Sequence, residues 1–321
     1  MRTQTEPPLK KRRSAFTLIE IMVATVIMVI LVGLVIQITS EVLKVWNRSS
    51  GKLSANAEAR IAMDLLTQDL ETAVFRNNGL RWLEANTVEM PSVAGHKAQT
   101  VNLILFSPAL DRPSTDRSDV DIPGDICAVQ YQLVYQDPVN GGSGTPEDNM
   151  YALHRRVIDP STTFNNLMGD GNQDNFDWAS AAVPPATGVD MEYLAPERPE
   201  NYLAGHIANF RVDFYVVDQS GDPVKVPSPI KFGGKDSGGV STATVGANST
   251  IASTRYPLAY AEISLTVLSG EGTALLQNLT TPGRGGTGYK DDPDGLSSGE
   301  QVVREHGEVY TRRVNFLARP L

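Results

Sequence analysis

Glu20 is the residue whose position in the sequence most strongly indicates chemistry. It is the only charged residue in an apolar run that covers residues 16–38, and a compact basic cluster precedes that run. The cluster consists of Lys10, Lys11, Arg12 and Arg13. A carboxylate near the end of a membrane-spanning helix costs about 2–3 kcal/mol, so it is generally retained for a function such as pairing with a cation. The alternative is that Glu20 simply reaches the nearby interface, as polar side chains at helix ends do.

The apolar run has the length of a membrane-spanning helix. Residues 16–38 would make about 35 Å of helix, enough to cross a hydrocarbon core of about 30 Å. Flanking basic residues stay cytoplasmic, which predicts that the chain after residue 38 lies across the membrane. A secretory signal peptide has a shorter apolar core and a small-residue cleavage site, and Thr-Ser-Glu-Val at 39–42 is not such a site. An ordinary signal anchor fits the length but leaves Glu20 unexplained.

A third interpretation, based on the residues around position 15, also explains why a glutamate stands in the apolar run. A basic cluster, Ala15, Phe16-Thr-Leu, a glutamate and an apolar run follow one another in an order that resembles the processing motif of type IV prepilins and type II secretion pseudopilins. The resemblance implies that a prepilin peptidase cleaves between Ala15 and Phe16 and N-methylates Phe16, although the family usually has glycine where Ala15 stands. It also implies that Glu20 pairs with the N-terminal ammonium of a neighbouring subunit, because each charge is tolerable in lipid only as a pair.

The predicted helix continues beyond the membrane. No proline occurs between Phe16 and Met90, so nothing forces the helix to end at the membrane surface, although we expect a bend or short break at 47–51. Apolar residues then recur with helical spacing. They are Leu53, Ala57, Ile61, Leu65, Leu66, Leu70 and Val74. We expect this stripe to pack against a following sheet, with a partner-binding groove as the alternative.

The remainder of the chain predicts short strands separated by turn residues. The expected strands are residues 101–107, 126–135, 150–157, 207–217, 260–268 and 309–316. Alternate residues are apolar in two of them, 126–135 and 207–217, which is the period of a half-buried strand. The predicted fold class is α+β, with a long N-terminal transmembrane and amphipathic helix packed on an antiparallel β-sheet head, as in pilins.

This interpretation divides the chain into four segments. They are a leader at 1–15, a transmembrane helix at 16–38, a periplasmic continuation of the helix at 39–78 and a strand-rich head at 79–321. Loop insertions are expected near 161–199 and 232–255. The order of the pieces resembles the minor pseudopilin J of type II secretion, but the insertions have no counterpart there. The matching features are Leu-x-x-Asp-Leu at 66–70, Val-x-Tyr-x-Leu at 129–133, Leu153-x-Arg155, Val212-Asp213-Phe214 and residues 257–268.

Two loops carry oxygen ligands that could bind calcium. The first set is Asp170, Asn172, Asp174 and Asp177, and a looser second set is Asp291, Asp292, Asp294 and Glu300. The first set alternates as calcium loops do, but it lacks the glycine at the sixth position and the glutamate at the twelfth. Clusters of Asp and Asn also mark ordinary turns, so both interpretations stay open. No other cofactor is expected.

The sequence gives no support for an enzyme. The four histidines are scattered, and no zinc, phosphate-loop or serine-hydrolase motif occurs. The single cysteine, Cys127, lies in an apolar strand and is better explained as core. The net charge of −9 argues against a nucleic-acid partner, with a local basic patch at His154-Arg155-Arg156 as the exception that stays open.

These features predict a single-pass inner-membrane subunit with a cytoplasmic N-terminus and a periplasmic head. We expect a structural minor pseudopilin or pilin that assembles into a type II secretion pseudopilus or a type IV pilus-like filament, or at its tip. The expected partners are other pilin-like subunits through the N-terminal helix, the prepilin peptidase and the inner membrane. The alternative is a membrane-anchored extracytoplasmic binding or adhesion module that joins no filament.

Overall fold

Helix α1 (Leu18–Glu71) begins the part of the chain that the structure describes. This structure is a computed structural model. It describes residues 17–75, 82–90, 92–109, 126–141, 148–158, 160, 163, 199–217, 220–228, 230–232, 245–246, 258–280 and 294–316. The chain forms two compact units, Met1–Ser50 and Gly51–Leu321, and α1 contributes residues to both. The bend or break expected at 47–51 is wrong, because the helical assignment is unbroken there.

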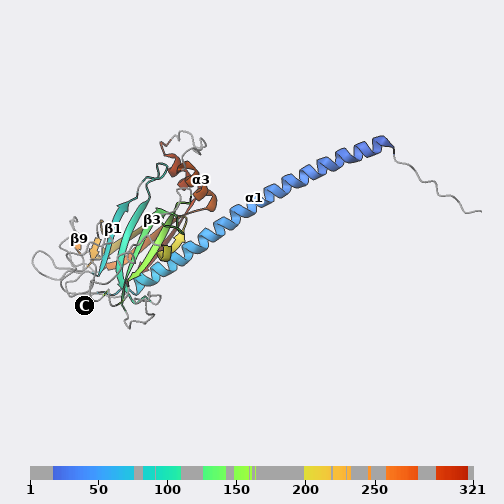
Figure 1. Ribbon diagram of the computed structural model, residues 1–321. Helices are drawn as coiled ribbons and strands as arrows, with labels where there is room; N and C mark the ends of the chain where they lie inside the picture. The colour runs from blue at the N-terminus through green and yellow to red at the C-terminus, as the bar shows by residue number, and fades with distance from the viewer. Residues whose placement is uncertain are drawn as a thin grey trace, which may run out of the picture. The chain divides into compact units, whose positions relative to one another are not determined.

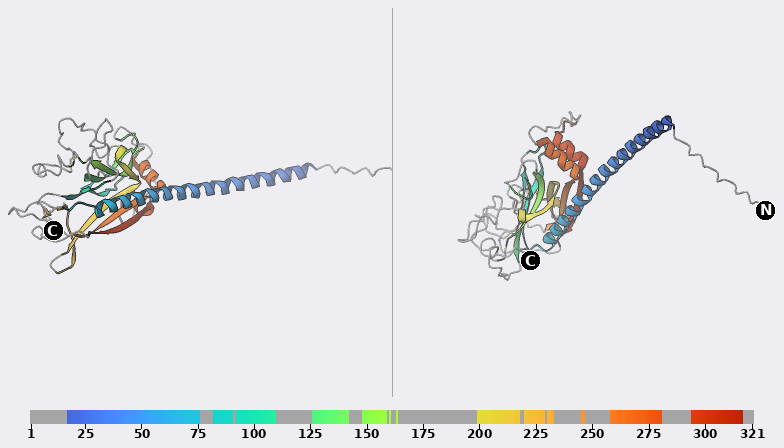
Figure 2. Two further views of the ribbon diagram at one scale, coloured as in Figure 1. Left: turned by 90° about the horizontal axis from the view of Figure 1, so that it is seen from below. Right: turned by 45° about the vertical axis from the view of Figure 1, so that its right-hand side comes forward.

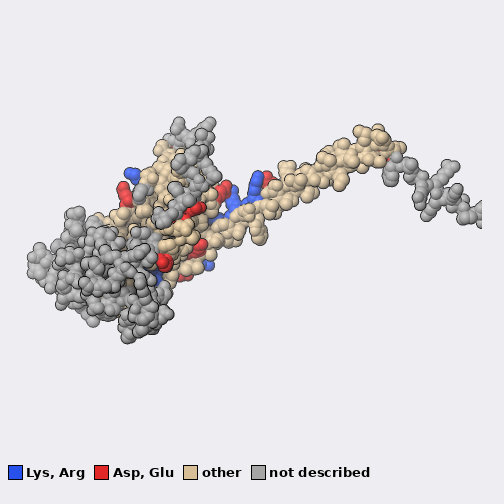
Figure 3. Space-filling model, in the orientation of Figure 1, with Lys and Arg blue, Asp and Glu red and all other residues tan. Residues whose placement is uncertain are grey.

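In the first unit, α1 carries a long stretch without charge. Residues 21–40 contain no Lys, Arg, Asp or Glu, and this stretch of the helix is plain tan in Figure 3. Its threonines satisfy their hydroxyl groups within the helix, since Thr25 Oγ1 donates to the Met22 carbonyl at 2.9 Å and Thr39 Oγ1 to the Val35 carbonyl at 2.8 Å. The side chains of the stretch therefore leave few polar groups that need water.

Within the described residues, the second unit combines the rest of α1 with a sheet, two shorter α-helices and one 3₁₀ helix. Its strands are β1 (Leu83–Glu89), β2 (Gln99–Ser107), β3 (Cys127–Gln136), β4 (Met150–Ile158), β5 (Tyr202–Gly205), β6 (Ile207–Val217), β7 (Pro223–Lys225), β8 (Ile230–Phe232), β9 (Val245–Gly246), β10 (Leu258–Leu268) and β11 (Gly307–Asn315). Its helices are η3 (Pro199–Asn201), α3 (Gly270–Thr280) and α4 (Ser298–His306). Each of the six expected strands corresponds to a strand of the structure, within three residues at either end.

The strands form one branched sheet, part of which is visible in Figure 1. Its main path runs β11-β10-β6-β2-β1-β8-β9, while β3 pairs with β2 and β4, β4 with β5, and β6 with β7. The described pairings are antiparallel apart from a single parallel pair, Thr100 with Phe210, which joins β2 to β6. The predicted α+β fold class is confirmed, and the sheet is mixed because of this one parallel contact.

Burial alternates along β6, whereas β2 is buried at every residue after Gln99. In β6, Phe210, Val212 and Phe214 are buried, whereas the intervening Arg211 is exposed. An aromatic cluster extends this core towards the end of α1: the ring centroid of Trp82 lies 4.6 Å from that of Phe75 and 5.5 Å from that of Phe232. Close ring packing of this kind adds to the burial of apolar area.

Helices α3 and α4 were not among the elements predicted from the sequence. They pack side by side in the second unit and are drawn in orange and red in Figure 2. Helix α4 begins with a capping box, in which the Ser297 hydroxyl accepts from the Glu300 N–H and the Glu300 carboxylate accepts from the Ser297 N–H at 2.8 Å. Ser-x-x-Glu before a helix is a readable start signal, so this helix could have been found.

The expected insertions near 161–199 and 232–255 lie largely outside the described residues. The division of the chain into leader, membrane helix, continuation and head stays a prediction.

Candidate functional site

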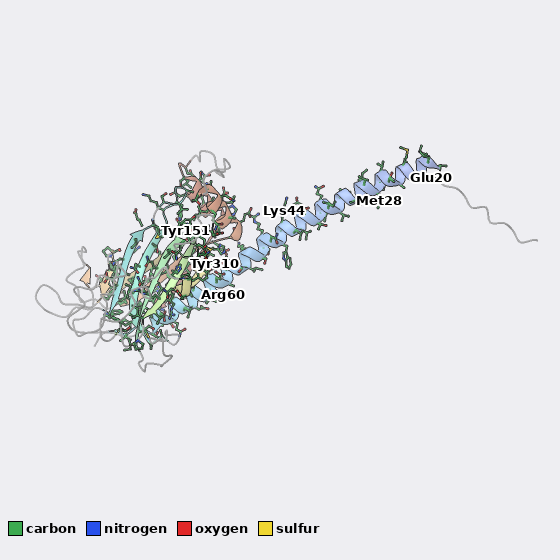
Figure 4. The ribbon with its side chains drawn as sticks, viewed as in Figure 1. Glu20, Met28, Lys44, Arg60, Tyr151 and Tyr310 are labelled. Carbon is green, nitrogen blue, oxygen red and sulfur yellow. The ribbon has the colours of Figure 1, made fainter. Side chains whose placement is uncertain are left out.

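Glu20 lies in the first turn of α1 (Figure 4). Its carboxylate is held there by Thr17. Its Oε2 accepts a hydrogen bond from the Thr17 backbone N–H at 2.9 Å and another from Thr17 Oγ1 at 3.0 Å. The Thr17 hydroxyl in turn accepts from the Glu20 N–H at 3.4 Å. This is a reciprocal cap, and the positive end of the helix dipole adds to its stabilisation of the carboxylate. Glu20 is exposed, so its carboxylate can be reached by a partner.

The other residues of the predicted processing site lie outside the described residues. They are Ala15 and Phe16 at the expected cut, and Lys10, Lys11, Arg12 and Arg13 in the basic cluster. The structure therefore describes the helix start immediately after the expected cut. Cleavage, methylation and the pairing of Glu20 stay predictions.

The first unit provides one helix that is long and apolar enough to cross a membrane. The most apolar window of α1 has a mean hydropathy of 2.9, and none of that window is buried within the chain. Its large side chains, from Leu18 to Ile38, are about half exposed or more. An apolar surface of this size has to be covered by lipid or by other protein chains.

In the second unit, α1 packs on the sheet through small residues. The buried residues of the helix are Ala55, Ala59, Ala62, Met63, Leu66, Asp69 and Leu70. The stripe expected from the sequence is wrong in its first half, since Leu53, Ala57 and Ile61 are exposed. Leu66 and Leu70 are buried as expected. Over this first half of the contact, the smaller alanines are therefore buried and the larger Leu53 and Ile61 are not.

Polar contacts join this part of α1 to two strands, β5 and β11. Glu58 Oε2 accepts from the Gly205 N–H at 2.9 Å and from the Tyr202 hydroxyl at 3.0 Å, both in β5. Two ion pairs lead to β11, one from Lys52 Nζ to Glu308 Oε2 at 3.0 Å and one from Arg312 Nη1 to Asp64 Oδ1 at 2.5 Å. Tyr310, also on β11, lies near Arg60 in Figure 4.

A fourth contact is fully buried and links α1 to β3 and β4. Asp69 Oδ2 accepts from the Tyr131 hydroxyl at 2.5 Å and from Arg155 Nε at 2.8 Å, and its Oδ1 accepts from Arg155 Nη2 at 3.2 Å. Ser107 Oγ donates to Oδ1 at 3.4 Å. We call Asp69, Tyr131 and Arg155 the buried cluster. Its three members come from three elements that are far apart in the sequence, α1, β3 and β4.

The protonation state of Tyr131 follows from its surroundings. Burial and the adjacent Asp69 carboxylate raise the pKa of Tyr131 well above 10, and the Arg155 guanidinium offsets only part of this rise. Tyr131 therefore keeps its proton and donates it in the hydrogen bond to Asp69. The cluster joins a negative, a positive and a neutral group, and Asp69 has a donor at each oxygen.

Three further expectations can be compared with the structure. His154, Arg155 and Arg156 are all buried, so the basic surface patch left open by the sequence is wrong. Cys127 is buried in β3, in agreement with a core position. In the second calcium candidate, Glu300 caps α4 and Asp294 Oδ2 pairs with Arg304 Nη1 at 3.1 Å, while Asp291 and Asp292 lie outside the described residues, so this candidate stays a prediction.

The first calcium candidate, with Asp170, Asn172, Asp174 and Asp177, lies outside the described residues. Among the residues that the structure describes, no group of three or more His, Cys, Asp and Glu side chains could hold a metal ion.

Comparison with known proteins bears on the N-terminal segment. Residues 10–36 match the model of the prokaryotic N-terminal methylation motif. No match was found among curated proteins. Among solved structures, a type IV-like pilin from Thermus thermophilus is similar at 12% identity and a TM-score of 0.34, over 81% of this chain and 95% of that chain. The matched motif makes the N-terminal segment of this chain pilin-like.

Proposed function

We propose that the chain is a structural, non-enzymatic subunit of a pilin-like filament. Within that class we infer a minor pseudopilin of a type II secretion pseudopilus or a minor type IV pilin. The single observation that carries the proposal is the methylation motif over residues 10–36, which contains Glu20 at the fifth position after the Ala15–Phe16 bond.

The proposal gives each part of the N-terminal segment a role. A prepilin peptidase cleaves after Ala15 and methylates the new amino group of Phe16. The helix from Phe16 to Ile38 holds the subunit in the inner membrane before assembly, with the leader in the cytoplasm and the head in the periplasm. Glu20 then pairs with the Phe16 amine of a neighbouring subunit, which sets the step between subunits because an unpaired charge in lipid is costly.

Exposed apolar side chains on α1 support contact with neighbouring subunits. In the second unit, Leu53 is 68% and Ile61 is 56% exposed, on the side of the helix away from the buried alanines. A free head leaves these side chains in water. In a filament, the helices of adjacent subunits would cover them and thereby recover the free energy of burying apolar area.

The experiment that tests this proposal is mass spectrometry of the N-terminal peptide of the full chain, purified from membranes of its native cell. The expected N-terminus is Phe16 carrying one methyl group, for the unchanged chain and for Ala15→Gly. Ala15→Leu is the matched variant and should keep the leader, because a bulky residue replaces the small one at the cut. An N-terminus that retains the leader in the unchanged chain, or one that begins after residue 38, would overturn the proposal.

A further inference from the structure

Trp46 is an exposed aromatic side chain on α1, in the first unit. It is 70% exposed, and it is the only aromatic residue among the exposed large apolar residues of the part of the chain that the structure describes. The indole ring is a large apolar surface that also carries one N–H donor. Neither the N-terminal motif nor the contacts within the head account for such a ring at this position.

The charge-free stretch of α1 has the thickness of a hydrocarbon core. Residues 21–40 make about 30 Å of helix, and the hydrocarbon core of a bilayer is about 30 Å thick. Glu41 is the first charged residue after this stretch, and Lys44 follows it along the same helix (Figure 4). When residues 21–40 fill the core, the polar interface therefore begins near Glu41.

Trp46 follows this stretch at the distance of the headgroup layer. Its Cα lies six positions after Ser40, which is about 9 Å along the helix axis. Side chains of a helix lean towards its N-terminus, so the indole ring lies closer to the hydrocarbon core than its Cα does. The headgroup region adds about 5–8 Å to each side of the core. The ring of Trp46 therefore reaches this layer.

The residues around Trp46 have the chemistry of the same layer. Val42, one turn closer to the core on the same face of α1, is apolar and 59% exposed. Lys44 has a long side chain whose ammonium group can reach lipid phosphates while its stem lies along apolar surface. Apolar contacts thus lie on the core side of Trp46 and a cation lies beside it, as at the interface between lipid chains and headgroups.

We propose that Trp46 is a lipid contact: in the membrane-inserted subunit, its indole ring lies in the phospholipid headgroup layer on the side where α1 leaves the bilayer. The ring covers the outer ends of the lipid chains, and its N–H donates to an ester or phosphate oxygen of a lipid. The inference rests on the membrane placement in the proposed function, and it does not depend on filament assembly.

The test measures tryptophan fluorescence of the full chain in phosphatidylcholine vesicles. One set of vesicles contains lipids brominated near the headgroup and another contains lipids brominated near the chain end, because bromine quenches a tryptophan close to it. Trp82→Phe/Trp178→Phe leaves Trp46 as the only tryptophan. Trp82 Nε1 has no hydrogen-bond partner among the described residues, so phenylalanine removes no such bond there. The difference between the unchanged chain and Trp46→Phe gives the same measurement without a change in the head.

Two variants move the tryptophan along α1 in the same background. Trp46→Phe/Leu31→Trp places it near the middle of the charge-free stretch, and Trp46→Phe/Leu53→Trp places it on the same face as Trp46 but about 10 Å farther from the core. Leu31 and Leu53 are both exposed, so neither change disturbs the packing of the head.

The proposal predicts that lipids brominated near the headgroup quench Trp46 at least about twofold more than lipids brominated near the chain end. The order should be reversed for Leu31→Trp, and Leu53→Trp should be quenched by neither. Quenching of Leu31→Trp without quenching of Trp46 would overturn the proposal and keep the membrane placement. Stronger quenching of Trp46 by the chain-end lipids would also overturn it. Absence of quenching at both positions would overturn the membrane placement, and this inference with it.

Discussion

Arg312 on β11 contacts Asp64 on α1, with Nη1 2.5 Å from Oδ1, although the two residues are 248 positions apart in the sequence. Asp69 and Arg155 form a second pair of the same charges on the same helix. The two pairs differ in burial: the side chains of the first are 59% and 40% exposed, and those of the second are 5% and 6% exposed. Replacing the arginine of each pair should therefore change the free energy of unfolding by different amounts.

We predict that Arg155→Met lowers the free energy of unfolding by about 3–5 kcal/mol, because it leaves the Asp69 carboxylate buried without its cation. Arg312→Met should lower it by at most about 1 kcal/mol, because Asp64 is solvated. Urea unfolding of the full chain in detergent, followed by tryptophan fluorescence, measures both values. Equal losses would contradict the assigned difference in burial.

The capping box of α4 gives a second prediction. Ser297→Ala removes the hydroxyl that accepts from the Glu300 N–H and should lower the free energy of unfolding by about 1 kcal/mol. Ser298→Ala is the matched control one residue later, inside the helix, and should change stability little. The same urea unfolding experiment measures the free energy of unfolding of both variants. An equal loss for Ser297→Ala and Ser298→Ala would contradict a capping role of Ser297.

The stability of the head should depend on pH through His206. Burial lowers the pKa of His206, and Glu58 offsets part of the shift. As the pH is lowered below about 6.5, the unfolded chain takes up the proton before the folded chain does. The free energy of unfolding therefore decreases as the pH is lowered, until the pH reaches the pKa of His206 in the folded chain. For this one group the decrease is at most about 1.4 kcal/mol per pH unit.

His206→Asn tests this dependence, because asparagine tolerates the positive φ of 61° at this position. The difference in unfolding free energy between pH 7.5 and pH 5.5 should be smaller in this variant than in the unchanged chain. His96, whose pKa burial also lowers, keeps part of the dependence in both. An unchanged difference in the variant would show that His206 does not contribute.

The exposed face of α1 gives a prediction about assembly. Ile61→Asp should leave the free energy of unfolding within about 0.5 kcal/mol, since an exposed side chain contributes little to the fold. It should reduce the amount of the chain recovered in sheared filaments, because a charge would then face the neighbouring helices. The exposed Arg60→Asp on the same turn is a control that changes the charge without removing an apolar side chain. Filament recovery at the unchanged level for Ile61→Asp would remove this face from the interface.

Much of the head could be predicted from local patterns. Short apolar runs between turn residues located the six principal strands, and in β3 and β6 alternate apolar residues added the period of a half-buried strand. The short strands β7, β8 and β9 carry too few residues to show a period. Helix α3 has glycine at two of its first three positions, Gly270 and Gly272, and glycine is a weak helix former, so the helix depends on packing against α4 and β10.

The contacts of α1 could not be predicted in the same way. Leu53 and Ile61 have the spacing of a core stripe, yet the sheet contacts the smaller Ala55, Ala59 and Ala62 instead. Sequence spacing identifies faces of a helix but does not decide which face meets the sheet. Asp69 illustrates the same limit, because a carboxylate in a helix is expected in water unless its partners, here Tyr131 and Arg155, are known to lie opposite.

The most direct test of the assembly role is the recovery of Glu20→Gln in filaments from cells that make the native assembly system. Glu41→Gln, an exposed glutamate farther along the same helix, is the matched control. We predict that both variants are processed at Phe16 and reach the membrane. Glu20→Gln should enter filaments roughly tenfold less than the unchanged chain, as expected for the loss of about 1.4 kcal/mol per subunit contact, whereas Glu41→Gln should enter normally. Recovery of Glu20→Gln at the level of the unchanged chain would contradict an assembly role and favour a membrane-anchored binding module.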